Sequence, residues 1–70
     1  MISYAPLFKT LEEKEKTQYW MMTYGGIGKS TFDRIKKGES LNLSTIEKMC
    51  NLLDCSMEDI VIVKADKKKA

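Results

Sequence analysis

Glycine spacing is the feature that most restricts how this chain can fold. The four glycines are Gly25, Gly26, Gly28 and Gly38. Glycine costs ~1 kcal/mol inside a helix and readily adopts the left-handed conformation that ends one. The middle of the chain is therefore divided into short helices joined by tight turns. With 70 residues in all, these helices must share one small core, because a chain of this length buries only ~60% of its unfolded surface.

Capping residues and apolar spacing locate the helices. Pro6 suits the first turn of a helix, since its missing N–H has no partner there, and Thr17 is a candidate N-cap. Ser44, with Glu47 three residues later, predicts a capping box before an apolar helical face. The expected helices cover residues 6–15, 18–24, 29–37, about 45–53 and 57–60. The predicted fold class is all-α, a compact bundle of about five short helices.

The predicted core consists of the apolar residues on these helical faces: Leu7, Leu11, Met21, Ile27, Phe32, Ile35, Ile46, Met49, Cys50, Leu53 and Ile60. The β-branched residues 61–63 favour a strand, but an all-α chain offers no obvious partner for it. This segment either folds back onto its own core or pairs with its counterpart in a second copy. We assign residues 1–63 to one domain and expect residues 64–70 to form a disordered basic tail.

Charge is unevenly distributed, although the net charge is only +2. Residues 29–37 carry four basic side chains and one acidic side chain, whereas residues 38–63 carry one basic and five acidic side chains. The last seven residues are basic again. The basic excess on one short helix therefore says more about a partner than the net charge does.

The string GGIGKST, residues 25–31, invites comparison with a phosphate-binding loop. That loop has the pattern G-x-x-x-x-G-K-[ST] and lies between a buried strand and a helix. Gly28, Lys29 and Ser30 match its second half, but Thr23 occupies the position of the first glycine. The segment before it is capped like a helix. We therefore expect no nucleotide site.

Residues that commonly carry chemistry are few. The chain has no histidine, and Cys50 and Cys55 are its only cysteines. Two cysteines are too few ligands for a structural zinc site. We expect both to be reduced core residues, with a redox pair or an intersubunit disulfide as alternatives. We predict no enzyme activity, catalytic residue, metal or cofactor. No segment has the ~20 apolar residues of a membrane span, so we expect a cytoplasmic protein without a membrane partner.

The stretch TQYWMMTYGGIGKSTFDRIKKGE, residues 17–39, resembles the lambda-repressor-like (Cro/repressor-type) DNA-binding family. The family pattern is T-Q-x-x-L-A-x-x-x-G-[IV]-S-x-S-T-[IV]-x-x-[IL]-x-x-G. The chain follows it without a gap at Thr17, Gln18, Met21, Gly26, Ile27, Ser30, Thr31, Phe32, Ile35 and Gly38. It departs at Met22 (usually alanine), Gly25 (usually apolar) and Gly28 (usually serine). The resemblance covers residues 10–60 and is strongest to short bacterial transcriptional regulators.

The resemblance implies that a helix-turn-helix is formed by the second and third helices, with helix 29–37 in the major groove of double-stranded DNA. The implied base contacts are Lys29, Ser30, Asp33 and Arg34. Lysine and arginine donate to guanine, and aspartate accepts from cytosine. Asp33 can instead pair with Lys29 or Lys37 along the helix, and Arg34 can instead contact only phosphate.

The resemblance also implies contacts to the DNA backbone. Gln18, at the start of the second helix, resembles the family's phosphate-binding amide, although it can also be a simple first-turn residue. Lys36, Lys37, Asn42 and Ser44 flank the same surface. Ser44 is alternatively occupied as a helix cap.

These features predict a sequence-specific DNA-binding transcriptional regulator, a repressor that acts as a homodimer on a pseudo-palindromic operator. The alternative on the same fold is a protein-interaction module, such as an antitoxin-like partner. Such a module would bind another protein through Trp20 and the C-terminal segment. Trp20 lies off the main apolar face, where it either fills space beside the first helix or contacts a partner.

Overall fold

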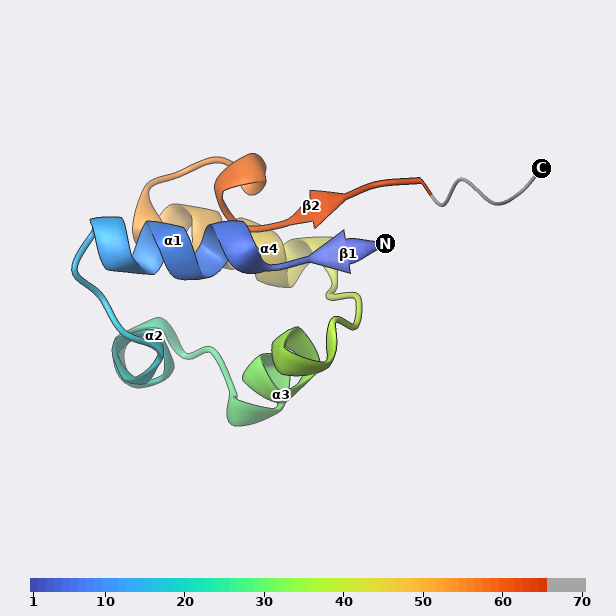
Figure 1. The fold of residues 1–70 in the computed structure, drawn as a ribbon. Coiled ribbons are helices and arrows are strands. Elements are labelled where there is room, and N and C mark those ends of the chain that lie inside the picture. The colour runs from blue at the N-terminus through green and yellow to red at the C-terminus, as the bar shows by residue number, and fades with distance from the viewer. Residues whose placement is uncertain (66–70) are drawn as a thin grey trace.

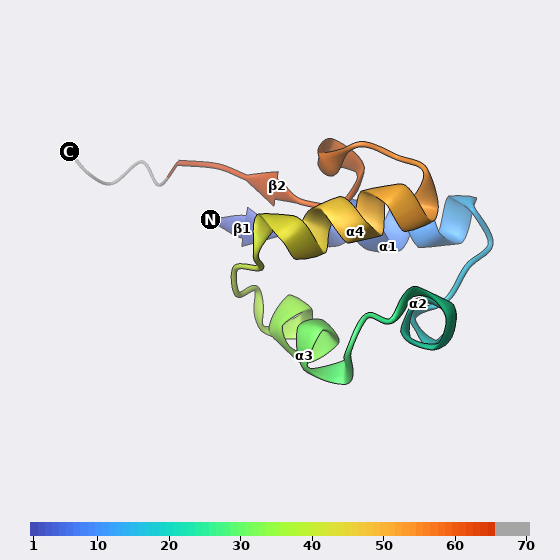
Figure 2. The same ribbon diagram turned by 180° about the vertical axis from the view of Figure 1, so that it is seen from behind.

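The helices come close to the predicted ranges. A computed structural model describes residues 1–65 of the protein. In chain order its elements are β1 (Ile2–Ser3), α1 (Ala5–Glu13), α2 (Gln18–Gly25), α3 (Lys29–Lys37), α4 (Leu43–Leu53), the 3-10 turn η1 (Met57–Asp59) and β2 (Ile62–Val63). In both views α1, α4 and η1 form one side of the molecule, and α2 and α3 form the other (Figures 1 and 2). The predicted all-α bundle is confirmed, with a small two-stranded sheet added.

The glycine turn between α2 and α3 adopts the predicted conformations. Gly26 ends α2 with φ of 70°, and its N–H donates to the Met21 carbonyl. Gly38 ends α3 in the same way, with φ of 72°. Both φ angles lie in the left-handed region, where a residue that has a Cβ is strained. Gly28 has φ of −72° and precedes α3 as its N-cap. These turns hold α2 and α3 as a helix-turn-helix.

Gly25 belongs to the last turn of α2 and does not end it. A Cβ at this position would collide with the side chain of Leu52 on α4. The missing side chain thus lets α2 approach α4 closely. This contact explains a glycine where the family usually has an apolar residue.

The core contains almost every residue predicted for it. Its fully buried members include Leu7, Met21, Met49 and Ile60, contributed by α1, α2, α4 and the segment after η1. Cys50 is only half-buried and packs against the edge of this cluster, so its assignment to the core interior was wrong. Tyr4 and Val61 are additional buried members.

The C-terminal segment has a partner strand in its own chain. β2 pairs antiparallel with β1, with Ile2 opposite Val63 and Ser3 opposite Ile62. The expectation that no partner strand exists was wrong, because two residues at the N-terminus are too few to produce a strand pattern. Ile60 and Val61 are buried while β2 is exposed, so the fold-back interpretation is confirmed for the first half of the segment. The predicted basic tail lies outside the described residues from residue 66 onward.

The first turn of α4 differs from the prediction. The helix begins at Leu43, with Asn42 as its N-cap. The Asn42 carbonyl accepts from the N–H groups of Thr45 and Ile46, at 3.0 and 3.1 Å. Ser44 therefore lies inside the helix and is not its cap. A capping box formed by Ser56 and Asp59 begins η1.

Candidate nucleic-acid interface

Helix α3 presents one polar face to solvent. Phe32 and Ile35 anchor the opposite face in the core. Because successive helical residues are about 100° apart, the residues that point away from this anchor are Ser30, Asp33, Arg34 and Lys37. Lys29 and Lys36 lie together on one flank. All six side chains are exposed, so α3 offers every predicted base-contacting residue to an approaching partner.

Asp33 is the acidic residue of α3, and its possible ion-pair partners are the lysines one turn away. Within residues 1–65, Asp33 forms no ion pair with Lys29 or Lys37. The basic residues Arg34, Lys36 and Lys37 occupy the last turn of α3, where they complement the negative end of the helix dipole. The Asp33 carboxylate therefore remains available as an acceptor on the exposed face.

Helices α2 and α4 begin on either side of α3 in the chain, and within residues 1–65 the first two N–H groups of each helix donate no hydrogen bond. Thr17 caps α2 by accepting a hydrogen bond from the Trp20 N–H at 3.0 Å. Gln18 follows as the first residue of α2 and is half-buried. The Asn42 side chain makes no cap hydrogen bond to α4. The first N–H groups of a helix lack intrahelical partners and attract anions, so both termini are suited to phosphate.

A polar recess lies between α3 and the start of α4. It has a volume of about 310 Å³ and is lined by Thr31, Arg34, Leu41, Asn42 and Thr45. The structure thus brings together two residues predicted from the sequence, Arg34 and Asn42. Thr31 and Thr45 were not predicted to line the recess, although Thr31 matches the family pattern and Thr45 lies in the first turn of α4. Ser44 is exposed beside the recess and does not line it.

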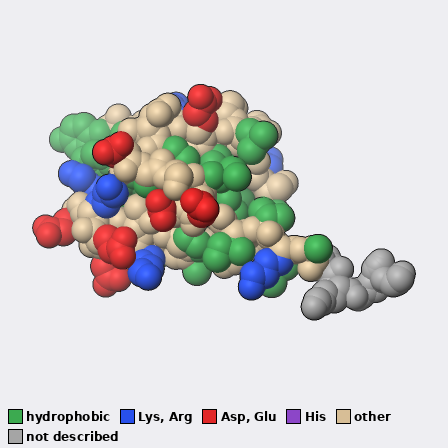
Figure 3. All heavy atoms as spheres, turned by 90° about the horizontal axis from the view of Figure 1, so that it is seen from above, with side chains coloured by type: hydrophobic (Ala, Val, Ile, Leu, Met, Phe, Trp, Pro, Cys, Tyr) green, Lys and Arg blue, Asp and Glu red, His purple; other side chains and the backbone are tan. Residues whose placement is uncertain are grey.

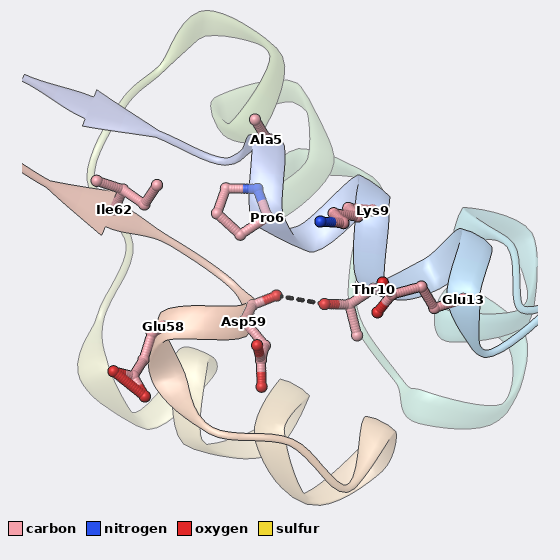
Figure 4. A pocket seen from close by; sticks show the side chains of 8 residues that line it. All are labelled: Ala5, Pro6, Lys9, Thr10, Glu13, Glu58, Asp59 and Ile62. Carbon is pink, nitrogen blue, oxygen red and sulfur yellow. Dashed lines mark hydrogen bonds between the residues drawn. The ribbon is translucent and has the colours of Figure 1, made fainter.

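The opposite side of the molecule has a different character. A hollow of about 430 Å³ lies between α1 and η1, and Lys9, Glu13, Glu58 and Asp59 are among the residues that line it (Figure 4). Across this side, acidic and basic side chains are interspersed with apolar ones (Figure 3). Among residues 1–65 no cluster of side chains is suited to holding a metal ion. The polar face of α3 is therefore the surface that matches the predicted function.

Trp20 has a structural role at the edge of the core. It is partly buried and packs against the core cluster. Its ring lies 6.2 Å from that of Tyr24, and the Lys16 ammonium lies 4.6 Å from its centroid. Trp20 thus fills space at the edge of the core, while Tyr24 itself is exposed.

The two cysteines adjoin each other at the end of α4. The Cys55 N–H donates to the Cys50 carbonyl at 3.0 Å, which closes the helix after Asp54 adopts a left-handed conformation. Burial raises the pKa of both thiols, and the nearby Asp59 carboxylate raises the pKa of both further. A raised pKa lowers the thiolate fraction and with it reactivity. This environment is that of structural cysteines.

Comparison with known proteins agrees with this geometry. The sequence model of the Cro/C1-type HTH DNA-binding domain matches residues 7–66. The chain belongs to the Cro/C1-type helix-turn-helix family. No curated protein matches it. Among solved structures, the crystal structure of the transcriptional regulator VanUg (Form II) is similar, with a TM-score of 0.83 at 28% identity over 93% of this chain and 87% of that chain.

In this Cro/C1-type domain the GKST string has a structural explanation. Gly28 is the N-cap of α3, and residues 29–31 form the first turn of that helix. The segment before it is α2, not the strand that a phosphate-binding loop requires. The prediction that GGIGKST is not a nucleotide-binding loop therefore agrees with the local structure. Within residues 1–65, no helix has the length and apolar character needed to cross a bilayer.

Proposed function

We propose that this protein is a sequence-specific transcriptional regulator that reads the major groove of DNA with α3. The exposed polar face of α3 carries the proposal, because it holds both donors and an acceptor suited to base edges. Lys29 and Arg34 would donate to guanine, and Asp33 would accept from the cytosine amino group. Ser30, which is short and both donates and accepts, would contact a base beside them.

Backbone contacts would fix the position of α3 in the groove. Gln18 at the start of α2 and Asn42 at the start of α4 would bind phosphates together with the free N–H groups there. Lys36 and Lys37 would add charge at the end of α3, and Ser44 would donate from the first turn of α4. These contacts carry no sequence information, but they orient the helix that does.

We further propose that the protein represses by occupying its site, in the cytoplasm, as a homodimer. Dimeric helix-turn-helix proteins bind half-sites about one turn of DNA apart, ~34 Å. An apolar hollow of about 200 Å³ adjoins the sheet. At its rim Leu43 and Val63 are 73% and 71% exposed. Two copies facing each other across a two-fold axis would cover these side chains.

The test is selection of bound duplexes from a random pool, followed by titration of the selected duplex at several salt concentrations. We expect one enriched motif with two-fold symmetry. Affinity should fall steeply with salt, since each neutralised phosphate contributes a slope of about −0.9 in a plot of log K against log salt. An antitoxin-like protein-interaction module would enrich no motif. The absence of an enriched motif at low salt would contradict the proposal.

A further inference from the structure

Tyr4, near the N-terminus of the chain, forms a hydrogen bond with the loop that follows α3. It precedes α1 and is only 4% exposed. Its hydroxyl donates to the Glu39 carbonyl at 2.6 Å, across a separation of 35 residues. Burial raises the pKa of the phenol, so the hydroxyl keeps its proton and remains a donor near neutral pH.

Glu39 begins the connection from α3 to α4. The Glu39 N–H donates a hydrogen bond to the Arg34 carbonyl at 2.9 Å. This bond closes the end of α3 at Gly38. From there the chain runs through Ser40 and Leu41 to Asn42, the N-cap of α4. Within residues 1–65, the hydrogen bond from Tyr4 is the only one that joins residues 38–42 to a part of the chain outside α3 and α4.

The position of this loop matters for binding because it separates two parts of one surface. Arg34 on α3 and Asn42 at the start of α4 line the same polar recess. A duplex that contacts both must meet them at a fixed separation. A loop that shifts would leave α3 intact and move Asn42, with the N-terminus of α4, away from its phosphate.

We propose that Tyr4 is a positioning residue for the DNA interface. Its hydroxyl fixes the α3–α4 loop so that Asn42 and the start of α4 contact the same duplex as α3. The inference rests on the proposed function, since it assigns a role within that interface. It assigns Tyr4 no contact with DNA.

The chain offers a matched control for this role. Thr10 is 5% exposed, and its hydroxyl donates to the Asp59 carbonyl at 2.7 Å (Figure 4). This bond has the same chemistry as the Tyr4 bond, a hydroxyl on a backbone carbonyl. It joins α1 to η1, on the side of the molecule away from α3 (Figure 1). Its loss should destabilise the fold without moving the α3–α4 loop.

The experiment compares Tyr4→Phe with Thr10→Val, each of which removes one buried hydroxyl with little change in shape. Thermal unfolding is measured first, and titration of the selected duplex follows at a temperature where all variants are folded, over a series of salt concentrations. Both variants should melt below the wild type. Only Tyr4→Phe should lose affinity, by about five- to tenfold, the cost of one hydrogen bond of ordinary strength. Its salt slope should stay close to the wild-type slope, because uncharged groups make the lost phosphate contact, and the slope counts phosphates neutralised by charged side chains.

A double-mutant comparison tests whether Tyr4 affects binding through Asn42. If Tyr4 acts by placing Asn42, then Tyr4→Phe should cost clearly less affinity in an Asn42→Ala background than in the wild type. Should Tyr4→Phe not fold, Leu41→Gly loosens the same loop and must lose affinity in its place. Wild-type affinity for the folded loop variant, or an equal loss for Thr10→Val, would overturn the inference. Failure of the wild type to select any duplex would instead overturn the proposed function itself.

Discussion

The basic side chains of α3 lie at different positions along the helix. Lys29 is the first residue of the helix, and Arg34 begins the last turn, which Lys37 ends. The N-terminal part of a recognition helix approaches base edges, and the C-terminal part lies nearer the DNA backbone. Residues of one charge on one helix should therefore have different effects on specificity.

Substitution by alanine should separate these roles. Lys29→Ala and Arg34→Ala should each weaken binding to the selected duplex by ~1–3 kcal/mol and relax the base preference at one position. Lys37→Ala should weaken binding to selected and random duplexes alike. Titration of both duplexes with each variant is the measurement. Equal losses on both duplexes for all three variants would mean that Lys29 and Arg34 do not read bases.

Ionisation of the two thiols should make the free energy of unfolding depend on pH in the alkaline range. The pKa values of Cys50 and Cys55 are raised in the folded chain, so the unfolded chain ionises first as pH rises. Their contribution to stability is complete below the unfolded thiol pKa of ~8.5 and is lost as pH rises through the folded values. Denaturant unfolding from pH 7 to 10 should show this loss, and it should shrink in a Cys50→Ala, Cys55→Ala variant. An unchanged pH profile in that variant would rule out the thiols as its source.

Individual site residues were predictable where a local pattern assigned them. The exposure of Lys29, Ser30, Asp33 and Arg34 follows from helical spacing around Phe32 and Ile35. Tyr4 was not predictable, because its partner is a backbone carbonyl 35 residues away and no periodicity joins the two. The cap of α4 was assigned two residues too late, because Asn42 and Ser44 are both good caps and only the backbone decides between them.

At the scale of elements, Gly26 and Gly28 have different roles in the turn between α2 and α3. Gly26 has a left-handed backbone, whereas Gly28 has an extended one. A Cβ at Gly28 would meet only the Ser30 hydroxyl, at an ordinary 3.8 Å. The turn therefore requires glycine at the first position and merely tolerates it at the second.

Two substitutions should have opposite effects on the free energy of unfolding. Gly26→Ala should destabilise the domain by about 1 kcal/mol, because alanine is strained at positive φ. Gly28→Ser should stabilise it by a few tenths of a kcal/mol, since serine is the better N-cap. Chemical denaturation of both variants measures the difference. If Gly26→Ala is as stable as the wild type, the left-handed turn is not required.

The helices were predictable as elements because glycines and capping residues mark the ends of each helix in the sequence. The sheet was not, because each strand has only two residues. The β-branched segment indicated one strand, but its partner lies at the other end of the chain and carries no alternating pattern. Pairing between the termini is a property of the fold, not of either segment.

At the scale of the whole molecule, the sheet and α3 lie at different parts of the surface (Figure 1). The exposed rim residues Leu43 and Val63 adjoin the sheet. Contact between two copies at this place would leave α3 of each copy free for DNA. The isolated interface would be small, and small interfaces associate weakly.

Sedimentation at increasing protein concentration tests the proposed dimer. The wild type should show reversible self-association, and Val63→Lys should remain monomeric, because a charge would be placed in an apolar contact. Thr23→Lys adds the same charge on the exposed surface of α2 and should behave like the wild type. A wild type that stays monomeric and binds two half-sites without cooperativity would exclude dimerisation through the sheet.

The central claim, that α3 reads bases in the major groove, is tested most directly by a dimethyl sulfate footprint on the selected duplex. The reagent methylates guanine at N7, an atom exposed in the major groove. The wild type should protect particular guanines within each half-site, and Arg34→Ala should lose protection at one of them while keeping the rest. No protection of guanine N7 by the bound wild-type protein, or the same pattern with Arg34→Ala and Lys29→Ala, would contradict the claim.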